Sequence, residues 1–175
     1  MKFLNFYNKY IINYDLLNKF SYKYITELPK INSIIVHFSL KKTDLKLLIT
    51  YLSALKLITN QKGVIILSKN PNIILKVKKG TPVGCKITLR RKKMLEFYFK
   101  LFNKSFLTLQ KPKLDKKTLS FQITDVFSFE ELEANYQFFS SLKKINININ
   151  TKSSCKIQNR FLLYSFKVIT SPSHL

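Results

Sequence analysis

Strict alternation between apolar and polar residues is the feature that most constrains the fold of this chain. In residues 145–150, three isoleucines alternate with three asparagines. The segments 85–90 and 119–124 alternate in the same way, with cysteine, isoleucine, leucine or phenylalanine at every second position. Successive side chains of a strand point to opposite faces, so each segment predicts a strand with one buried and one exposed face. The pattern is typical of an antiparallel sheet that is covered on one side only.

Helical segments are interspersed with these strands. Residues 43–58 place leucine and isoleucine at helical spacing with lysines on the other side, and residues 94–106 are apolar and aromatic. The remaining predicted elements are helices over 3–20 and 155–166, strands over 31–39 and 64–67, and a short helix after residue 128. This order predicts a single domain over 1–175 of the α+β class, an antiparallel sheet with helices packed on one face and the other face open.

The positive charge of the chain bears on what the open face could bind. Lysine and arginine total 31 against 9 acids, which gives a net charge of +22 spread from Lys2 to Lys167. A domain so unbalanced repels itself unless a polyanion neutralises it, and nucleic acid is the usual partner. An anionic membrane surface is the main alternative.

The predicted open face contains no acid and combines cations with amides and hydroxyls. Such groups can bond the phosphates, 2′-hydroxyls and base edges of RNA, although a merely solvated face would explain the asparagines equally well. The residues on this face are Lys86, Thr88, Arg90, Ser120, Gln122, Asn146, Asn148 and Asn150.

Two of the three glycines of the chain, Gly80 and Gly84, flank Pro82 in a segment rich in cations. This clustering indicates backbone geometry that a side chain would obstruct. Lysines precede the turn and Lys86, Arg90 and Arg91 follow it, which suits a phosphate backbone. An ordinary hairpin with a solvated basic rim is the other interpretation.

Residues suited to catalysis are sparse. His37 and His174 are the only histidines, and Cys85 lies on the apolar face of its strand, as expected of a buried thiol. The one acidic cluster follows Ser128, and the Ser128–Glu131 spacing is a capping-box pattern that predicts a helix start. No phosphate-binding loop and no paired metal-ligand motif is present. We therefore predict neither an enzyme nor a cofactor or metal site. No apolar run reaches the roughly 18 residues of a membrane span.

Residues 79–90, Lys-Gly-Thr-Pro-Val-Gly-Cys-Lys-Ile-Thr-Leu-Arg, followed by Met94, Glu96, Phe97 and Phe99, carry a specific resemblance. The segment resembles the universal family of large-subunit ribosomal proteins that bind 5S rRNA, the fifth in the usual numbering. Residues 28–31 and 60–62 fall in register with two further blocks of that family, so the resemblance covers nearly the whole chain. A Gly-rich stretch of the family is absent, and Lys111 to Lys117 stands in its place.

The resemblance implies an α+β protein of the central protuberance that supports translation and has no enzymatic activity. Implied partners are 5S rRNA, large-subunit rRNA, peptidyl-site tRNA, neighbouring large-subunit proteins and a protein of the small-subunit head. The implied rRNA-binding positions are His37, where the family usually has asparagine, and Gln61, Lys62, Lys86, Thr88 and Arg90. The implied tRNA-facing loop contains Lys76, Lys78, Lys79, Gly80, Thr81, Pro82 and Gly84.

The composition bears on where such a protein would act. Residues with A- and T-rich codons, such as lysine, asparagine and isoleucine, are abundant, whereas alanine occurs only at Ala54 and Ala134. Together with the resemblance, this bias predicts an organelle-encoded protein of the mitochondrial ribosome, in the mitochondrial matrix. A basic peripheral-membrane or respiratory-complex-associated protein is the alternative function.

Overall fold

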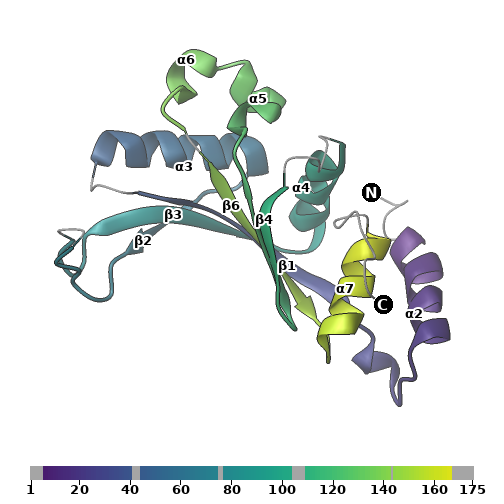
Figure 1. The fold of residues 1–175 in the computed structure, drawn as a ribbon. Coiled ribbons are helices and arrows are strands. Elements are labelled where there is room, and N and C mark those ends of the chain that lie inside the picture. The colour runs from purple at the N-terminus through teal and green to yellow at the C-terminus, as the bar shows by residue number, and fades with distance from the viewer. Residues whose placement is uncertain (1–5, 41–43, 75–76, 104–108, 143, 167–175) are drawn as a thin grey trace.

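A computed structural model describes residues 6–40, 44–74, 77–103, 109–142 and 144–166. Within these residues the chain forms one mixed α+β arrangement around an antiparallel sheet with strand order β2-β3-β1-β6-β5-β4 (Figure 1). The strands are β1 (Lys30–Ser39), β2 (Val64–Leu67), β3 (Pro82–Leu89), β4 (Leu109–Leu114), β5 (Thr118–Ile123) and β6 (Ile145–Lys152).

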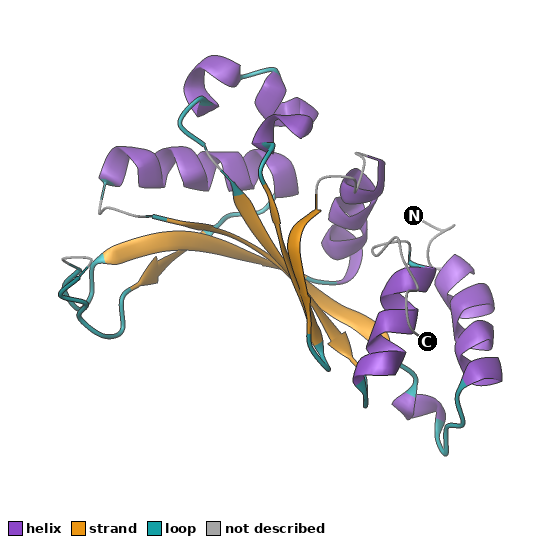
Figure 2. Ribbon diagram, in the orientation of Figure 1, coloured by secondary structure: helices purple, strands orange, loops and turns teal. Residues whose placement is uncertain are grey.

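Helices contact the sheet on one of its sides, and the other helices contact neighbouring helices (Figure 2). The longer ones are α2 (Asn13–Lys19), which continues the π-helical turn η1 (Asn8–Ile12), and α3 (Leu45–Thr59), α4 (Arg91–Asn103) and α7 (Lys156–Ser165). Short helical turns are η2 (Ile25–Glu27), η4 (Val126–Ser128), α5 (Glu130–Glu133) and α6 (Tyr136–Phe139). The predicted fold class is confirmed.

Alternation decides which face of the sheet is buried. In β6, Ile145, Ile147 and Ile149 are fully buried, whereas the three asparagines that alternate with them are half-buried. The same alternation holds in β3 and β5, and α3 and α4 pack against β3. Burying these side chains removes apolar surface from water and supplies the main driving force for folding.

Strand β1 lies at the centre of the sheet, between β3 and β6. Gly84 of β3 is buried opposite Ser39, and a Cβ atom at Gly84 would lie 2.3 Å from the carbonyl oxygen of Phe38. At Gly84 the backbone geometry does exclude a side chain, as the glycine clustering indicated. Glycine is also favoured at Gly80, whose φ is 83°.

The boundary between the implied tRNA-facing loop and the following strand was predicted wrongly, because β3 begins at Pro82 rather than Cys85. Pro82 pairs with Leu67 of β2, and Gly84 pairs with Ile66 of β2 as well as with β1. Pro82 and Gly84 therefore lie in the sheet and not in the loop. Proline and glycine usually mark strand ends, so alternation alone placed the start of the strand too late.

Strand β4 was not predicted at all. It contains Pro112, and its register with β5 shifts between Gln110 and Lys113. A proline cannot donate a hydrogen bond to a neighbouring strand and is confined to edge strands and bulges. Since β4 is the edge strand next to β5, it tolerates Pro112 and brings Lys113 into the sheet.

The capping-box prediction at Ser128 was also wrong in detail. Asp125 caps the turn η4 by accepting a hydrogen bond from the backbone N–H of Phe127 at 3.1 Å. The Ser128 hydroxyl donates to the carbonyl of Asp125 at 2.9 Å, and α5 starts after Phe129 without a side-chain cap. The helical segment exists, but Ser128 does not cap it, and the aspartate three residues earlier caps only the preceding turn η4.

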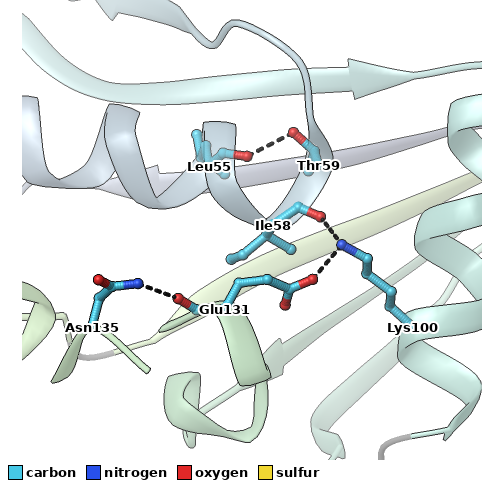
Figure 3. Close-up of polar contacts among 6 residues, drawn as sticks. All are labelled: Leu55, Ile58, Thr59, Lys100, Glu131 and Asn135. Atoms are coloured by element: carbon cyan, nitrogen blue, oxygen red, sulfur yellow. Dashed lines mark hydrogen bonds and ion pairs between the residues drawn. The ribbon is translucent and has the colours of Figure 1, made fainter. Parts of the chain in front are cut away.

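Glu131 joins three helices through Lys100 (Figure 3). The Lys100 ammonium of α4 donates to the carbonyl of Ile58, near the end of α3, at 2.9 Å and forms an ion pair with Glu131 of α5 at 2.5 Å. Both side chains are about one-third exposed, at 32% and 35%. This contact stabilises the packing of α5 over the end of α3.

Lys100→Met should lower the free energy of unfolding by about 1 kcal/mol, because one ion pair and one charge-assisted hydrogen bond are lost at a site that is about one-third exposed. Urea denaturation measures the change. Lys56→Met is the matched control, since Lys56 is exposed on α3, and it should change stability by less than about 0.5 kcal/mol. Equal effects of the two substitutions would contradict the role given to Lys100.

Candidate nucleic-acid interface

The face of the sheet away from the helices, here called the open face, is mostly polar, with Ile35 of β1 and the exposed Val64 of β2 as apolar members, and it contains no carboxylate at its described positions. Its positions are Ser33, Ile35 and His37 of β1, Lys86 and Thr88 of β3, Ser120 and Gln122 of β5, Asn146, Asn148 and Asn150 of β6, and Lys113 of β4. Arg90 follows β3 directly and is exposed. The predicted polar face is therefore assembled by the fold as one surface.

Strand register brings the predicted rRNA-binding residues together. His37 of β1 lies between Lys86 of β3 and Asn146 of β6. Gln61, which follows α3, donates from its side-chain amide to the carbonyl of Thr88 at 3.4 Å. Lys62 is exposed beside Gln61. Residues from distant parts of the sequence thus meet around the ends and centre of β3.

His37 is an uncharged member of this surface near neutral pH. Burial lowers the pKa of His37 below its ordinary value of 6.5, and the ammonium of Lys86 lowers it further. A neutral imidazole has one donor nitrogen and one acceptor nitrogen. His37 can therefore exchange hydrogen bonds with an RNA base or sugar, while Lys86 supplies the charge next to it.

Cys85, on the opposite side of β3, is fully buried, as predicted. Burial raises the pKa of its thiol to about 11, an effect that exceeds the opposing hydrogen bond with the backbone of Phe38. The thiol is therefore protonated at neutral pH and not suited to nucleophilic chemistry. Among the described residues, no group of three or more histidine, cysteine, aspartate or glutamate side chains could hold a metal ion.

A shallow hollow occupies the part of the open face between β1 and β4. It is lined by His37, Lys113, Ser120, Phe121, Gln122, Asn146 and Asn148. Sequence reasoning missed Lys113, because it lies in the unpredicted strand β4. A proline flanked by lysines between two leucines, Leu109 and Leu114, was the available signal for an edge strand.

The basic hairpin between β2 and β3 is closed by backbone hydrogen bonds. Ser68 donates to the carbonyl of Thr81 at 2.9 Å, and Gly80 donates to the carbonyl of Ser68 at 2.9 Å. Lys78 and Lys79 are exposed at this end of the hairpin, and the Thr81 hydroxyl donates to the carbonyl of Lys78 at 2.7 Å. Lys76 lies outside the described residues. The hairpin presents two lysines on an ordered turn that is separate from the open face.

Comparison of the sequence with known proteins places the chain in a family. A sequence profile of the ribosomal L5 family C-terminus matches residues 82–169. The large ribosomal subunit protein uL5m of Reclinomonas americana is 34% identical over 172 residues, which cover 90% of this chain and 92% of that protein. The chain belongs to the uL5 family of ribosomal proteins. The uL5 protein of Nitrosomonas europaea is 31% identical over 92% of this chain and 94% of its own length.

Membership of the uL5 family assigns the coarse function. The relatives are ribosomal proteins, which are structural components rather than enzymes. The chain is accordingly a structural constituent of the large ribosomal subunit, as the resemblance implied. None of the described helices is long and apolar enough to cross a membrane.

Proposed function

We propose that this uL5 protein binds 5S rRNA and large-subunit rRNA in the central protuberance through the open face of its sheet. The observation that carries the proposal is the chemistry of that face. Amides, hydroxyls and cations predominate on it, without a carboxylate at its described positions, and the buried side of the same strands forms the core. A-form RNA presents phosphates and 2′-hydroxyls to such a surface.

The proposed rRNA-binding residues are His37, Gln61, Lys62, Lys86, Thr88 and Arg90. Lys86, Arg90 and Lys62 are exposed cations that can bind phosphates, whereas His37 and Thr88 are partly buried between neighbouring strands. Gln61 is partly buried, and its amide is held on the backbone of β3. The cations would bind phosphates and position the RNA, and the neutral groups beside them would contact sugars and bases.

Binding to purified 5S rRNA tests this proposal directly. Affinity should fall steeply as salt rises, because each neutralised phosphate releases a counterion. Vesicles with anionic lipids should compete weakly, and the protein should sediment with large subunits in high salt. Fractionation with washed membranes free of ribosomes would instead favour the alternative of a basic peripheral-membrane or respiratory-complex-associated protein.

The basic hairpin is proposed to face peptidyl-site tRNA. Lys78, Lys79, Gly80 and Thr81 form its ordered turn, and the positive φ of Gly80 lets the backbone reverse there. Pro82 and Gly84 act within β3 by fixing where the hairpin leaves the sheet. Because the hairpin and the open face are distinct surfaces, they can serve two different RNA molecules.

Lys78→Ala combined with Lys79→Ala should weaken tRNA binding by ribosomes about tenfold, since two phosphate contacts are lost. Affinity for isolated 5S rRNA should stay within about twofold of the unmodified protein. Filter binding of tRNA to reconstituted subunits and of 5S rRNA to the free protein measures both quantities. A loss of 5S rRNA binding with unchanged tRNA binding would show that the hairpin binds 5S rRNA and not tRNA.

The surface over α5 and α6 is proposed to face protein rather than RNA. Residues 118–142 contain four acids and no lysine, arginine or histidine, in a chain with a net charge of +22. Tyr136 and Phe138 are 58% and 73% exposed there. Acids and exposed aromatics suit basic neighbouring proteins of the large subunit or the small-subunit head.

A mitochondrial ribosome in the matrix is the proposed location. One relative, from Reclinomonas americana, is named uL5m, and this chain shares 34% identity with it. The abundance of residues with A- and T-rich codons further supports an organelle gene. Bacterial uL5 proteins match nearly as well, at 29% and 31% identity, so localisation of a tagged protein and the position of its gene are the tests.

A further inference from the structure

A second group of cations lies at the end of the open face that is remote from Lys86. Lys30, at the start of β1, pairs directly with Lys152, at the end of β6. Lys116 lies beside them in the turn between β4 and β5, and all three side chains are exposed. Figure 1 shows this turn and the end of β6 at the same end of the sheet. We call these three residues the distal lysines.

The distal lysines extend the open face beyond its row of amides. The asparagines of β6 point to this face, and Lys152 continues their alternation. His37, next to Lys86, pairs with Asn146, and Lys152 follows Asn146 by six residues. At roughly 3.3 Å per residue, the two places are about 20 Å apart. The face therefore has cations toward both ends and neutral hydrogen-bonding groups between them.

The pairing of Lys30 with Lys152 costs stability in the free protein. Side chains directly opposite one another in an antiparallel pair have Cβ atoms about 5 Å apart, and like charges there repel each other. Neither ammonium forms an ion pair with a carboxylate of the described residues. The acids nearest in sequence bond within their own turns, Glu27 to a backbone N–H at 3.2 Å and Asp115 to a hydroxyl at 3.3 Å. A bound polyanion would remove the repulsion.

Buried polar groups hold the turn that contains Lys116 in place. The carbonyl oxygens of residues 115, 116 and 117 accept hydrogen bonds, in that order, from the Asn159 amide at 2.8 Å, the Ser153 hydroxyl and the backbone N–H of Thr151 at 2.8 Å. All three donor residues are buried. The Thr151 hydroxyl also donates to the side-chain oxygen of Asn159 at 2.7 Å. This network fixes the backbone of an exposed basic turn beside the end of β6.

We propose that the distal lysines bind a second stretch of phosphate backbone of the RNA that Lys86 and Arg90 bind, so that one RNA covers the open face lengthwise. The proposal rests on the proposed RNA-binding function of this face and extends that function to three further residues. Between the two groups of cations, the face presents amides and hydroxyls that suit 2′-hydroxyls, and no carboxylate at its described positions. Ammonium groups bind phosphates without reading bases, so the distal lysines add affinity and fix the orientation of the RNA.

Replacing the two paired lysines with glutamine tests the proposal, because it should change stability and binding in opposite directions. Lys30→Gln with Lys152→Gln should raise the midpoint of urea denaturation of the free protein at low salt, and the gain should shrink as salt screens the repulsion. The same double variant should bind 5S rRNA about tenfold more weakly. The dependence of its affinity on salt should be shallower by about two units of slope, and by about one more unit when Lys116→Gln is added.

The matched control is Lys46→Gln with Lys56→Gln, which removes the same charge from the exposed side of α3. It should lower 5S rRNA affinity less than about threefold, through net charge alone. Equal losses of affinity in the two double variants would attribute the effect to net charge and refute the distal site. A gain in stability with unchanged 5S rRNA affinity and salt dependence would refute it as well.

Failure of the distal site differs from failure of the proposed function. Undiminished 5S rRNA binding by Lys30→Gln with Lys152→Gln, together with weakened binding by Lys86→Gln with Arg90→Gln, would refute the distal site alone. Absence of 5S rRNA binding by the unmodified chain would refute the proposed function itself. On the unmodified chain, 5S rRNA should also protect the distal lysines from amine acylation, a result that needs no variant. Continued reactivity of all three would overturn the assignment.

Discussion

Replacing Lys86 and Arg90 together with glutamine is expected to weaken 5S rRNA binding about a hundredfold. Each lost charge-assisted contact costs about 1.5 kcal/mol. Both side chains are exposed, Lys86 within β3 opposite His37 of β1 and Arg90 directly after β3. The dependence of affinity on salt should also become shallower, by about one unit of slope for each phosphate contact that is lost. Binding titrations at several salt concentrations measure both effects.

The matched control removes the same charge from the other side of the molecule. Lys46 and Lys56 are exposed on α3, which packs on the helix-covered face of the sheet. Lys46→Gln with Lys56→Gln should lower 5S rRNA affinity less than about threefold, through the change in net charge alone. If both double variants lost affinity equally, binding would depend on overall charge, and the open face would have no special role.

Gly84→Ala is expected to destabilise the fold by about 3 kcal/mol, the upper end of the cost of overpacking a core. The added methyl group would lie 2.3 Å from the carbonyl oxygen of Phe38. That oxygen belongs to the backbone of β1, so relief requires the two central strands to move apart. Since small domains are stable by only about 5–15 kcal/mol, a large share of the total would be lost. The midpoint of urea denaturation measures the loss.

Gly80→Ala provides the comparison for Gly84→Ala. Gly80 has a φ of 83°, but no atom lies within 4 Å of the place that a Cβ atom would occupy there. The expected cost is therefore about 1 kcal/mol, from backbone strain alone. A destabilisation by Gly80→Ala as large as that by Gly84→Ala would contradict the close approach of β3 to β1.

Local periodicity was sufficient to predict most of the sheet. The isoleucines of β6 and the apolar residues of β3 and β5 are buried where alternation predicted them. A strand that is covered on one side alternates apolar and polar residues, so its own sequence shows which residues face the core. The helix α3 was predicted almost to its ends for the same reason. Its C-terminal Asn60 adopts the left-handed conformation that commonly ends helices.

Features that depend on distant partners were not predictable in this way. Strand β4 exists because β5 offers it an edge, although Pro112 disfavours a strand locally. The pairing of Pro82 and Gly84 with β2 likewise comes from the fold and not from their own preferences. Ser128 lost its expected capping role because Asp125 caps the preceding turn.

The candidate site shows the same division. Sequence reasoning identified the polar residues of β3, β5 and β6, since each follows from its own strand. It could not show that His37 lies between Lys86 and Asn146, or that Lys113 lines a hollow together with His37 and Asn146, because those neighbours depend on strand order. The family resemblance named functional positions, whereas the sheet register shows which of them share a surface.

Lysine footprinting in the presence of 5S rRNA tests the central claim most directly. Amine acylation followed by mass spectrometry compares each lysine in the free and the RNA-bound protein. The open face predicts strong protection of Lys86 and Lys113 and unchanged reactivity of Lys46 and Lys56 on α3, all four of which are exposed in the free chain. Protection of Lys46 and Lys56 with continued reactivity of Lys86 and Lys113 would show that the RNA binds the helical side and would contradict this account.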